Sequence, residues 1–221
     1  MKHYLLLLLL LLGLGTAQAQ QLQEEQRSER QLVFADFRDA KVLQTFGRFV
    51  KAKANILYKN AALCYVDEKN GKGYQASNAS IIGVVFDSIR YQKVDKVAMG
   101  RVIAEHGGNR LLCVTTIDME KYKEITGGST DLPFVSLDLG GLARETFIDM
   151  SGGEQQSNKG YPLKHTYYFS LKGRIVPARE KTIKKEVKPD MKVAFKNLME
   201  DRWWSWNDVP SLKQLFLYFP E

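Results

Sequence analysis

Short apolar or alternating segments run from about Gln31 to Asp118, and turn residues separate them every ten positions or so. Alternation with a period of two indicates strands, and closely spaced turns favour antiparallel neighbours. We therefore predict an antiparallel β-meander. Its expected strands are Lys41–Leu43, Lys51–Leu57, Ala62–Val66, Gly73–Ala76, Ile81–Phe86, Tyr91–Val94, Gly100–Ala104 and Leu111–Thr116.

Two turns anchor this prediction. Asn70-Gly71 separates the segment that ends at Val66 from the one that contains Tyr74, and Gly107-Gly108-Asn109 separates the last two predicted strands. Both sequences accept the positive φ angles that a tight hairpin demands. Each pair of flanking strands is therefore expected to form a hairpin.

The period changes to about 3.6 after Pro177, which predicts helices. One apolar series is Met191, Ala194, Phe195 and Leu198, and a second is Leu212, Leu215, Phe216 and Phe219. Pro189-Asp190 and Asp208 with Pro210 suit the two helix starts. The fold class is thus α+β and mainly β: an antiparallel meander that forms a sandwich or open barrel, followed by two C-terminal amphipathic helices.

The segment from Ile125 to Tyr161 is rich in glycine, serine, aspartate and asparagine. A loop of this length inside a domain is usually functional or mobile, although 134–137 suits a short strand. Two further strands are expected at His165–Leu171 and Arg174–Val176, with Lys172-Gly173 as the turn between them.

The N-terminus reads as an export signal. Lys2 precedes eight consecutive leucines, and Ala17-Gln18-Ala19 has the small residues of a cleavage site. The apolar run is shorter than the ~20 residues that cross a bilayer, so no transmembrane helix is expected in the mature chain. We predict a signal peptide at 1–19, a flexible leader at 20–30, a β-rich domain at 31–178 and a helical hairpin at 179–221, in a periplasmic or extracellular protein.

Several features are similar to those of an exported protein class. They are Phe34 and Phe37, the segment around Ala54-Asn55-Ile56, Leu63–Val66 before a glycine-containing turn, the unit Ile81–Tyr91, Tyr167-Tyr168-Phe169, Gly173 and a lysine-rich helical end with Ser211-Leu212. In these the chain resembles an exported β-rich class common in Bacteroidota that carries no assigned activity. The resemblance implies the compartment and a β-rich fold, and it implies no mechanism.

Charge is concentrated near the C-terminus. Residues 159–196 hold eleven basic and three acidic side chains, a balance of +8 within a chain whose formal charge is +7. We call Lys181, Lys184, Lys185 and Lys188 the lysine surface. It suits an anionic glycan, a lipid headgroup or an acidic envelope protein, and the competing interpretation is a solvated helix face.

Trp203, Trp204 and Trp206 form a second concentrated feature. Indoles pair a large apolar face with a donor N–H, so they suit recognition of sugars or proteins. Packing of the helices onto the core is the preferred interpretation. The adjacent pair Trp203 and Trp204 is difficult to bury together on a regular helix.

Cys64 and Cys113 lie inside apolar runs, which favours two buried thiols. An oxidising compartment makes a disulfide between them the alternative. His106 and His165 are expected at the surface rather than in catalysis, although a Ser–His–Asp arrangement stays open because triads are spatial. No zinc-type cluster, P-loop or nucleophile signature occurs, so no metal or cofactor is expected.

The preferred interpretation is a non-enzymatic binding or structural protein of the cell envelope or exterior with an anionic or protein partner. An exported hydrolase acting on glycans or peptides, with the glycine-rich segment as a lid, is the alternative. A small-molecule carrier that uses a barrel interior is a third candidate. No nucleic-acid partner is expected. A histidine–carboxylate contact in a cleft favours the hydrolase, and a flat basic or aromatic surface favours binding.

Overall fold

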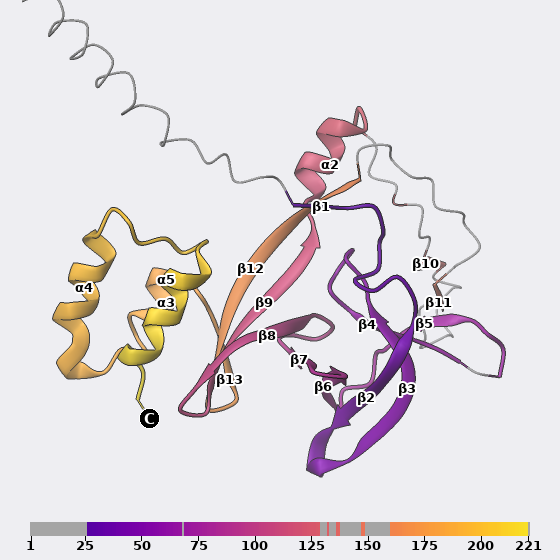
Figure 1. Cartoon of the computed structure of the whole chain (residues 1–221), viewed down its shortest axis with the longest axis horizontal. Coiled ribbons are helices and arrows are strands. Elements are labelled where there is room, and N and C mark those ends of the chain that lie inside the picture. Colours follow the sequence, from indigo (N-terminus) through magenta and orange to yellow (C-terminus); the bar gives the residue numbers. More distant parts are fainter. Residues whose placement is uncertain are drawn as a thin grey trace, which may run out of the picture.

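The structure is a computed structural model, shown in Figure 1, and it describes residues 26–67, 69–128, 132, 136–137, 147–148 and 160–220. The predicted signal peptide and most of the glycine-rich segment lie outside these residues. Within the described part, no helix is long and apolar enough to cross a membrane.

In the described part of the chain, thirteen strands form one sheet in which every pairing is antiparallel. They are β1 (Arg27–Ser28), β2 (Arg38–Gln44), β3 (Phe49–Ile56), β4 (Leu63–Val66), β5 (Gly73–Gln75), β6 (Ile81–Phe86), β7 (Ile89–Lys93), β8 (Met99–His106), β9 (Asn109–Ile117), β10 (Ser136–Leu137), β11 (Phe147–Ile148), β12 (Tyr161–Leu171) and β13 (Arg174–Pro177). The spatial order is β1-β12-β9-β8-β7-β6-β2-β3-β4-β5-β11-β10, and β13 pairs with β12. The mainly β, antiparallel fold class is therefore confirmed.

The sheet curls into a half-barrel, because the connection between β3 and β4 reaches across to the far strands. Ala62 bridges Ala98, and the Met99 N–H donates to the Ala61 carbonyl at 2.8 Å. The Ile117 N–H donates to the Tyr58 carbonyl, also at 2.8 Å. The open barrel is thus the form that the predicted meander takes.

Both anchoring turns are confirmed. Gly71 has a φ of +67° between β4 and β5, and Gly107 and Gly108 have φ angles of +55° and +78° between β8 and β9. Glycine adopts these left-handed angles without steric strain, whereas other residues adopt them at a cost in free energy. The glycines therefore explain why tight hairpins form at these two positions.

The helical elements are α2 (Met119–Ile125), α3 (Glu180–Ile183), α4 (Lys192–Glu200) and α5 (Val209–Gln214), with 3-10 turns η1 (Thr45–Gly47), η2 (Pro189–Met191) and η3 (Leu215–Tyr218). The two predicted C-terminal helices correspond to α4 and to α5 with η3. The short helices α2 and α3 were not predicted. The Asp118 side chain caps α2 by accepting from the backbone N–H groups of Glu120 and Lys121.

The C-terminal helices pack on the ends of β9, β12 and β13 and form a core of their own. Leu111 and Phe169 of the sheet are fully buried there with Leu212, Leu215 and Phe219. A second core fills the curl around Val84 and Phe86. Figure 1 shows α3, α4 and α5 grouped beside the lower part of the β9–β12 ribbon.

The folded part begins earlier than the sequence predicts. Arg27 and Ser28 of β1 pair with Pro162 and Tyr161 of β12, inside the stretch expected to be a flexible leader. A two-residue strand in a polar segment has no hydrophobic period to reveal it. This pairing matters for the site below.

Candidate functional site

A cleft of about 240 Å³ is lined by residues of β3, β7, β8, β9 and β12 and by three residues outside these strands. Its apolar lining consists of Val33, Ile56, Met99, Ile103 and Leu163. Its polar lining consists of Gln26, Tyr58, Tyr91, Arg101, Cys113, Thr115 and His165. A wider depression of about 690 Å³ beside β6 and β7 is a shallow surface feature, whereas the cleft gathers polar groups from six different segments.

Strand register explains this gathering. Tyr91 of β7 pairs with Arg101 of β8, and Arg101 pairs with Cys113 of β9. Thr115 lies two residues after Cys113 on the same face, and it pairs with His165 of β12. Side chains of paired residues point to one face of a sheet, so these five form adjoining rows.

Gln26, directly before β1, completes the site. The Leu163 N–H donates to the Gln26 carbonyl at 2.9 Å, which holds Gln26 beside β12. The Gln26 side-chain oxygen then accepts from Nε2–H of His165. The segment expected to be a leader therefore orients His165, and a hydrogen-bond contribution from Ser28 partly offsets the burial that raises the pKa of Tyr58.

The imidazole of His165 is held in one tautomer. Since Nε2 donates to Gln26, Nδ1 is the acceptor nitrogen. The Thr115 hydroxyl donates to Nδ1 at 2.9 Å, and the Cys113 Sγ lies 3.5 Å from the same nitrogen. The hydroxyl and the thiol thus compete for one lone pair.

Burial keeps these groups uncharged. Desolvation raises the pKa of the Cys113 thiol, against opposing contributions from the Thr115 hydroxyl and the Arg101 charge. Desolvation lowers the pKa of His165. Near neutral pH the pair is therefore a thiol and a neutral imidazole rather than a thiolate and an imidazolium.

The two tyrosines of the cleft also stay protonated. Burial raises the pKa of Tyr91 to about 12 and raises the pKa of Tyr58. Arg101, whose side chain is exposed, is the one charged residue in the described lining. The cleft therefore combines an apolar floor, neutral hydrogen-bonding groups and one cation at its edge.

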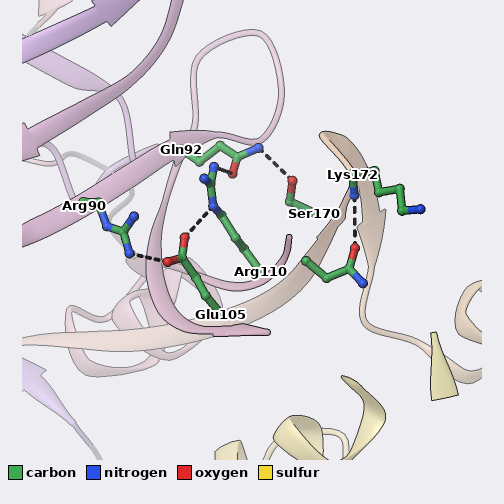
Figure 2. A network of polar contacts seen from close by, with 7 residues as sticks. Arg90, Gln92, Glu105, Arg110, Ser170 and Lys172 are labelled. Carbon is green, nitrogen blue, oxygen red and sulfur yellow. Dashed lines mark hydrogen bonds and ion pairs between the residues drawn. The ribbon is translucent and has the colours of Figure 1, made fainter. Parts of the chain in front are cut away.

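A different cluster of charged side chains crosses the same strands, as Figure 2 shows. Glu105 accepts hydrogen bonds from Arg90 and Arg110, each at 2.5 Å, and Arg110 also donates to Gln92 at 3.1 Å. Gln92 donates to Ser170 at 2.9 Å. The Arg90 contact is the main cause of the lowered pKa of Glu105. Two guanidinium groups thus share one carboxylate, and the network ties β7, β8, β9 and β12 together.

The lysine surface lies on α3 and the connection that follows it, away from the cleft lining. Lys181, Lys184 and Lys185 are exposed, and Lys188 is half-buried. None of the four forms an ion pair with a described residue. This leaves their charge available to solvent or to a partner.

The three tryptophans divide between two environments. Trp204 and Trp206 pack edge to face, with ring centres 4.5 Å apart, against the helical core. Trp203 is 79% exposed, and the guanidinium of Arg202 lies 4.9 Å from its ring centre. They occupy the non-helical connection before α5, which allows neighbouring indoles to face different ways.

The cysteines are free thiols on β4 and β9, which are not neighbours in the sheet, so no Cys64–Cys113 bridge is present. Cys64 is fully buried, and burial raises the pKa of its thiol. His106 is exposed on the β8–β9 hairpin. His165, expected at the surface, is instead half-buried in the cleft.

Sequence reasoning missed the cleft because its members are far apart along the chain. Cys113 and His165 are separated by 52 residues, and Gln26 and His165 by 139. Alternation predicts which face a side chain takes within one strand, but it does not predict which strands become neighbours. Within the described residues, no group of three histidine, cysteine or carboxylate side chains is placed to hold a metal ion.

Comparison with known proteins adds no relative. The chain matches no family model, no curated protein and no solved structure.

Proposed function

We propose that this is an exported, non-enzymatic binding protein whose cleft holds a small amphipathic acid, with the acid group on Arg101. The observation that carries the proposal is the lining of the cleft, where one arginine faces a set of apolar and neutral polar side chains. Export rests on the leucine run and the Ala17-Gln18-Ala19 motif, and it is supported by the resemblance to exported proteins.

The size of the cleft limits the ligand. Its 240 Å³ is below the range of about 300–1,000 Å³ that is usual for drug-sized ligands. Met99 and Ile56 are almost fully buried at its floor and suit a short alkyl or aromatic body. A small ligand with one apolar end therefore fits better than a polymer.

The charge of the cleft selects an acid. Arg101 forms no ion pair with a described residue. A guanidinium binds a carboxylate through two parallel hydrogen bonds, and such charge-assisted bonds are stronger than neutral ones. A cationic ligand would meet this charge with no carboxylate in the described lining to balance it. The protonated hydroxyls of Tyr58 and Tyr91 offer two further donors.

Calorimetry with matched probes tests the proposal. We expect hexanoate, octanoate or 3-phenylpropionate to bind, and the corresponding primary amides to bind roughly tenfold more weakly, because the ionic hydrogen bonds are lost. Arg101→Met retains the alkyl stem, and it should abolish the preference for acids. Lys164→Met removes an exposed cation from β12 outside the cleft lining and should preserve the preference.

Equal binding of acids and amides would contradict the proposal. So would an Arg101→Met variant that still prefers acids.

A thiol hydrolase is the second candidate, because the Cys113 Sγ lies 3.5 Å from Nδ1 of His165. In that reaction the thiol proton moves to Nδ1 as sulfur attacks an ester carbonyl, the imidazolium returns the proton to the leaving alkoxide, and water then cleaves the thioester. The closer Thr115 hydroxyl and the raised thiol pKa both oppose the first step. Hydrolysis of 4-nitrophenyl acetate that disappears in Cys113→Ala would favour the hydrolase, whereas binding of acids retained in that variant favours the non-enzymatic function.

A further inference from the structure

The β2–β3 hairpin ends in exposed apolar side chains. Phe46, within η1 at the tip, is 94% exposed, and Phe49 and Val50 at the start of β3 are 51% and 50% exposed. We call these three residues the hydrophobic tip. Figure 1 shows the hairpin reaching the lower edge of the molecule, apart from the C-terminal helices. The tip therefore presents apolar surface on a protruding element rather than on a flat face.

Phe46 has a backbone conformation that is unusual for a bulky residue. Phe46 has a φ of +61° and a ψ of +30°, the left-handed region that glycine adopts easily and bulky residues rarely adopt. The next residue, Gly47, is also left-handed, with a φ of +70°. A non-glycine outlier of this kind at an exposed turn points to a function for its side chain.

Basic side chains surround the tip. Lys41, Arg48 and Lys51 are exposed, and none of them forms an ion pair with a described residue. The Lys41 ammonium lies 5.2 Å from the ring centre of Phe49. Cations and aromatic rings are thus interleaved at this end of the hairpin.

We propose that the hydrophobic tip inserts into an anionic lipid surface, with Lys41, Arg48 and Lys51 at the level of the headgroups. Apolar side chains bury at the boundary between headgroups and acyl chains, and lysine or arginine next to them adds attraction to anionic lipids. The proposal is independent of the cleft and of its ligand.

The geometry favours lipid over a protein partner. A stable protein interface buries about 800 Å² on each side, with a well-packed centre. Three side chains on a hairpin tip are too few for such a surface. They are sufficient for interfacial insertion, in which each apolar group and each cation adds its own contribution.

Vesicle co-sedimentation tests the proposal with protein recovered after export. The probes are vesicles of pure phosphatidylcholine and vesicles of an equimolar mixture of phosphatidylcholine and phosphatidylglycerol. We expect binding to the anionic vesicles only, and a decline as salt is raised. The triple variant K41Q/R48Q/K51Q should bind weakly at all salt concentrations.

Phe46→Gly separates binding from folding. Glycine suits the left-handed turn, so the urea midpoint should stay the same or rise. Binding to the vesicles should fall roughly tenfold or more, because the ring that inserts into the lipid is lost. Phe46→Trp should retain binding. Val193→Ser removes an apolar side chain that is 73% exposed on α4, and it should leave binding unchanged.

Three results would overturn the proposal. They are anionic-vesicle binding by Phe46→Gly at the wild-type level, equal binding to pure phosphatidylcholine, and concentration-dependent dimerisation that Phe46→Gly abolishes. The last result would assign the tip to a second copy of the chain.

Discussion

Asn55 connects the chain before β2 to the centre of the sheet, and its removal should be costly. The side chain is fully buried on β3. Its amide nitrogen donates to the carbonyls of Phe34 and Asp36 at 2.9 and 3.0 Å, and its oxygen accepts from the Phe34 N–H at 3.0 Å. The same segment carries Val33 of the cleft and places the Phe34 ring 4.8 Å from that of Phe86.

Asn55→Ala leaves four backbone groups without this partner, because the buried Ile56 N–H also donates to the Asn55 oxygen at 2.8 Å. An unsatisfied buried group costs about 1–3 kcal/mol, and water can reach part of this segment because Phe34 is half-buried and Asp36 exposed. We therefore expect a loss of about 2–4 kcal/mol in the free energy of unfolding. A small cavity adds to the upper end of that range.

Urea denaturation followed by fluorescence measures this loss as a lower midpoint. The matched control is Asn78→Ala, since the exposed Asn78 side chain accepts a hydrogen bond from the nearby Ser80 N–H and solvent can replace this bond. The control should stay within about 0.5 kcal/mol of the wild type. An Asn55→Ala variant as stable as the control would refute the view that this amide organises the segment.

Four other predictions address processing, turns, thiols and charge. The intact mass of exported protein should match a chain that starts at Gln20, and full-length chain in the membrane fraction would oppose a cleaved signal. Gly71→Val should lower the free energy of unfolding by about 1 kcal/mol or more, because Gly71 has a φ of +67°. A Cβ at this position meets nothing within 4 Å, so a steric clash is not the cause. An unchanged urea midpoint would exclude backbone strain as the reason for glycine. After denaturation without reductant, Cys64 and Cys113 should both react with an alkylating reagent, and resistance of both would demonstrate a bridge. In the native protein, Cys113 should react faster as the pH rises toward its raised pKa. Replacing the four residues of the lysine surface by glutamate should weaken salt-sensitive retention on heparin, with little change in the unfolding midpoint. Unchanged retention would mean that these lysines only keep the surface solvated.

Much of the fold follows from local pattern. Alternation and turn chemistry predict the strands from β2 to β9 within a few residues, because Asn70-Gly71 and Gly107-Gly108 meet a strict backbone demand. The pairing of β6 with β2 rather than β5 is a property of the whole sheet, and no local signal encodes it. Short elements such as α2 and β1 cannot be predicted in this way, because they hold too few residues to show a hydrophobic period.

The cleft depends on this long-range register. Cys113 and Arg101 are each predicted to lie in a strand, yet their approach to His165 requires β12 to pair with β9 across the glycine-rich segment. Gln26 comes from a stretch whose composition suggests a leader. The lysine surface and the tryptophans, which are the concentrated features of the sequence, lie outside the cleft. Composition reveals clusters of one residue type, but it does not reveal which residues become neighbours across strands.

Methyl NMR of isoleucine- and methionine-labelled protein tests the central claim most directly, with octanoate as the probe. Saturating octanoate should shift the methyl signals of Ile56, Met99 and Ile103, which line the cleft, and should leave those of Met199 on α4 and Ile82 on β6 unchanged. The shifts should vanish in Arg101→Met. Shifts at Met199 or Ile82 in place of the cleft signals, or cleft shifts that persist without Arg101, would contradict an acid-binding cleft.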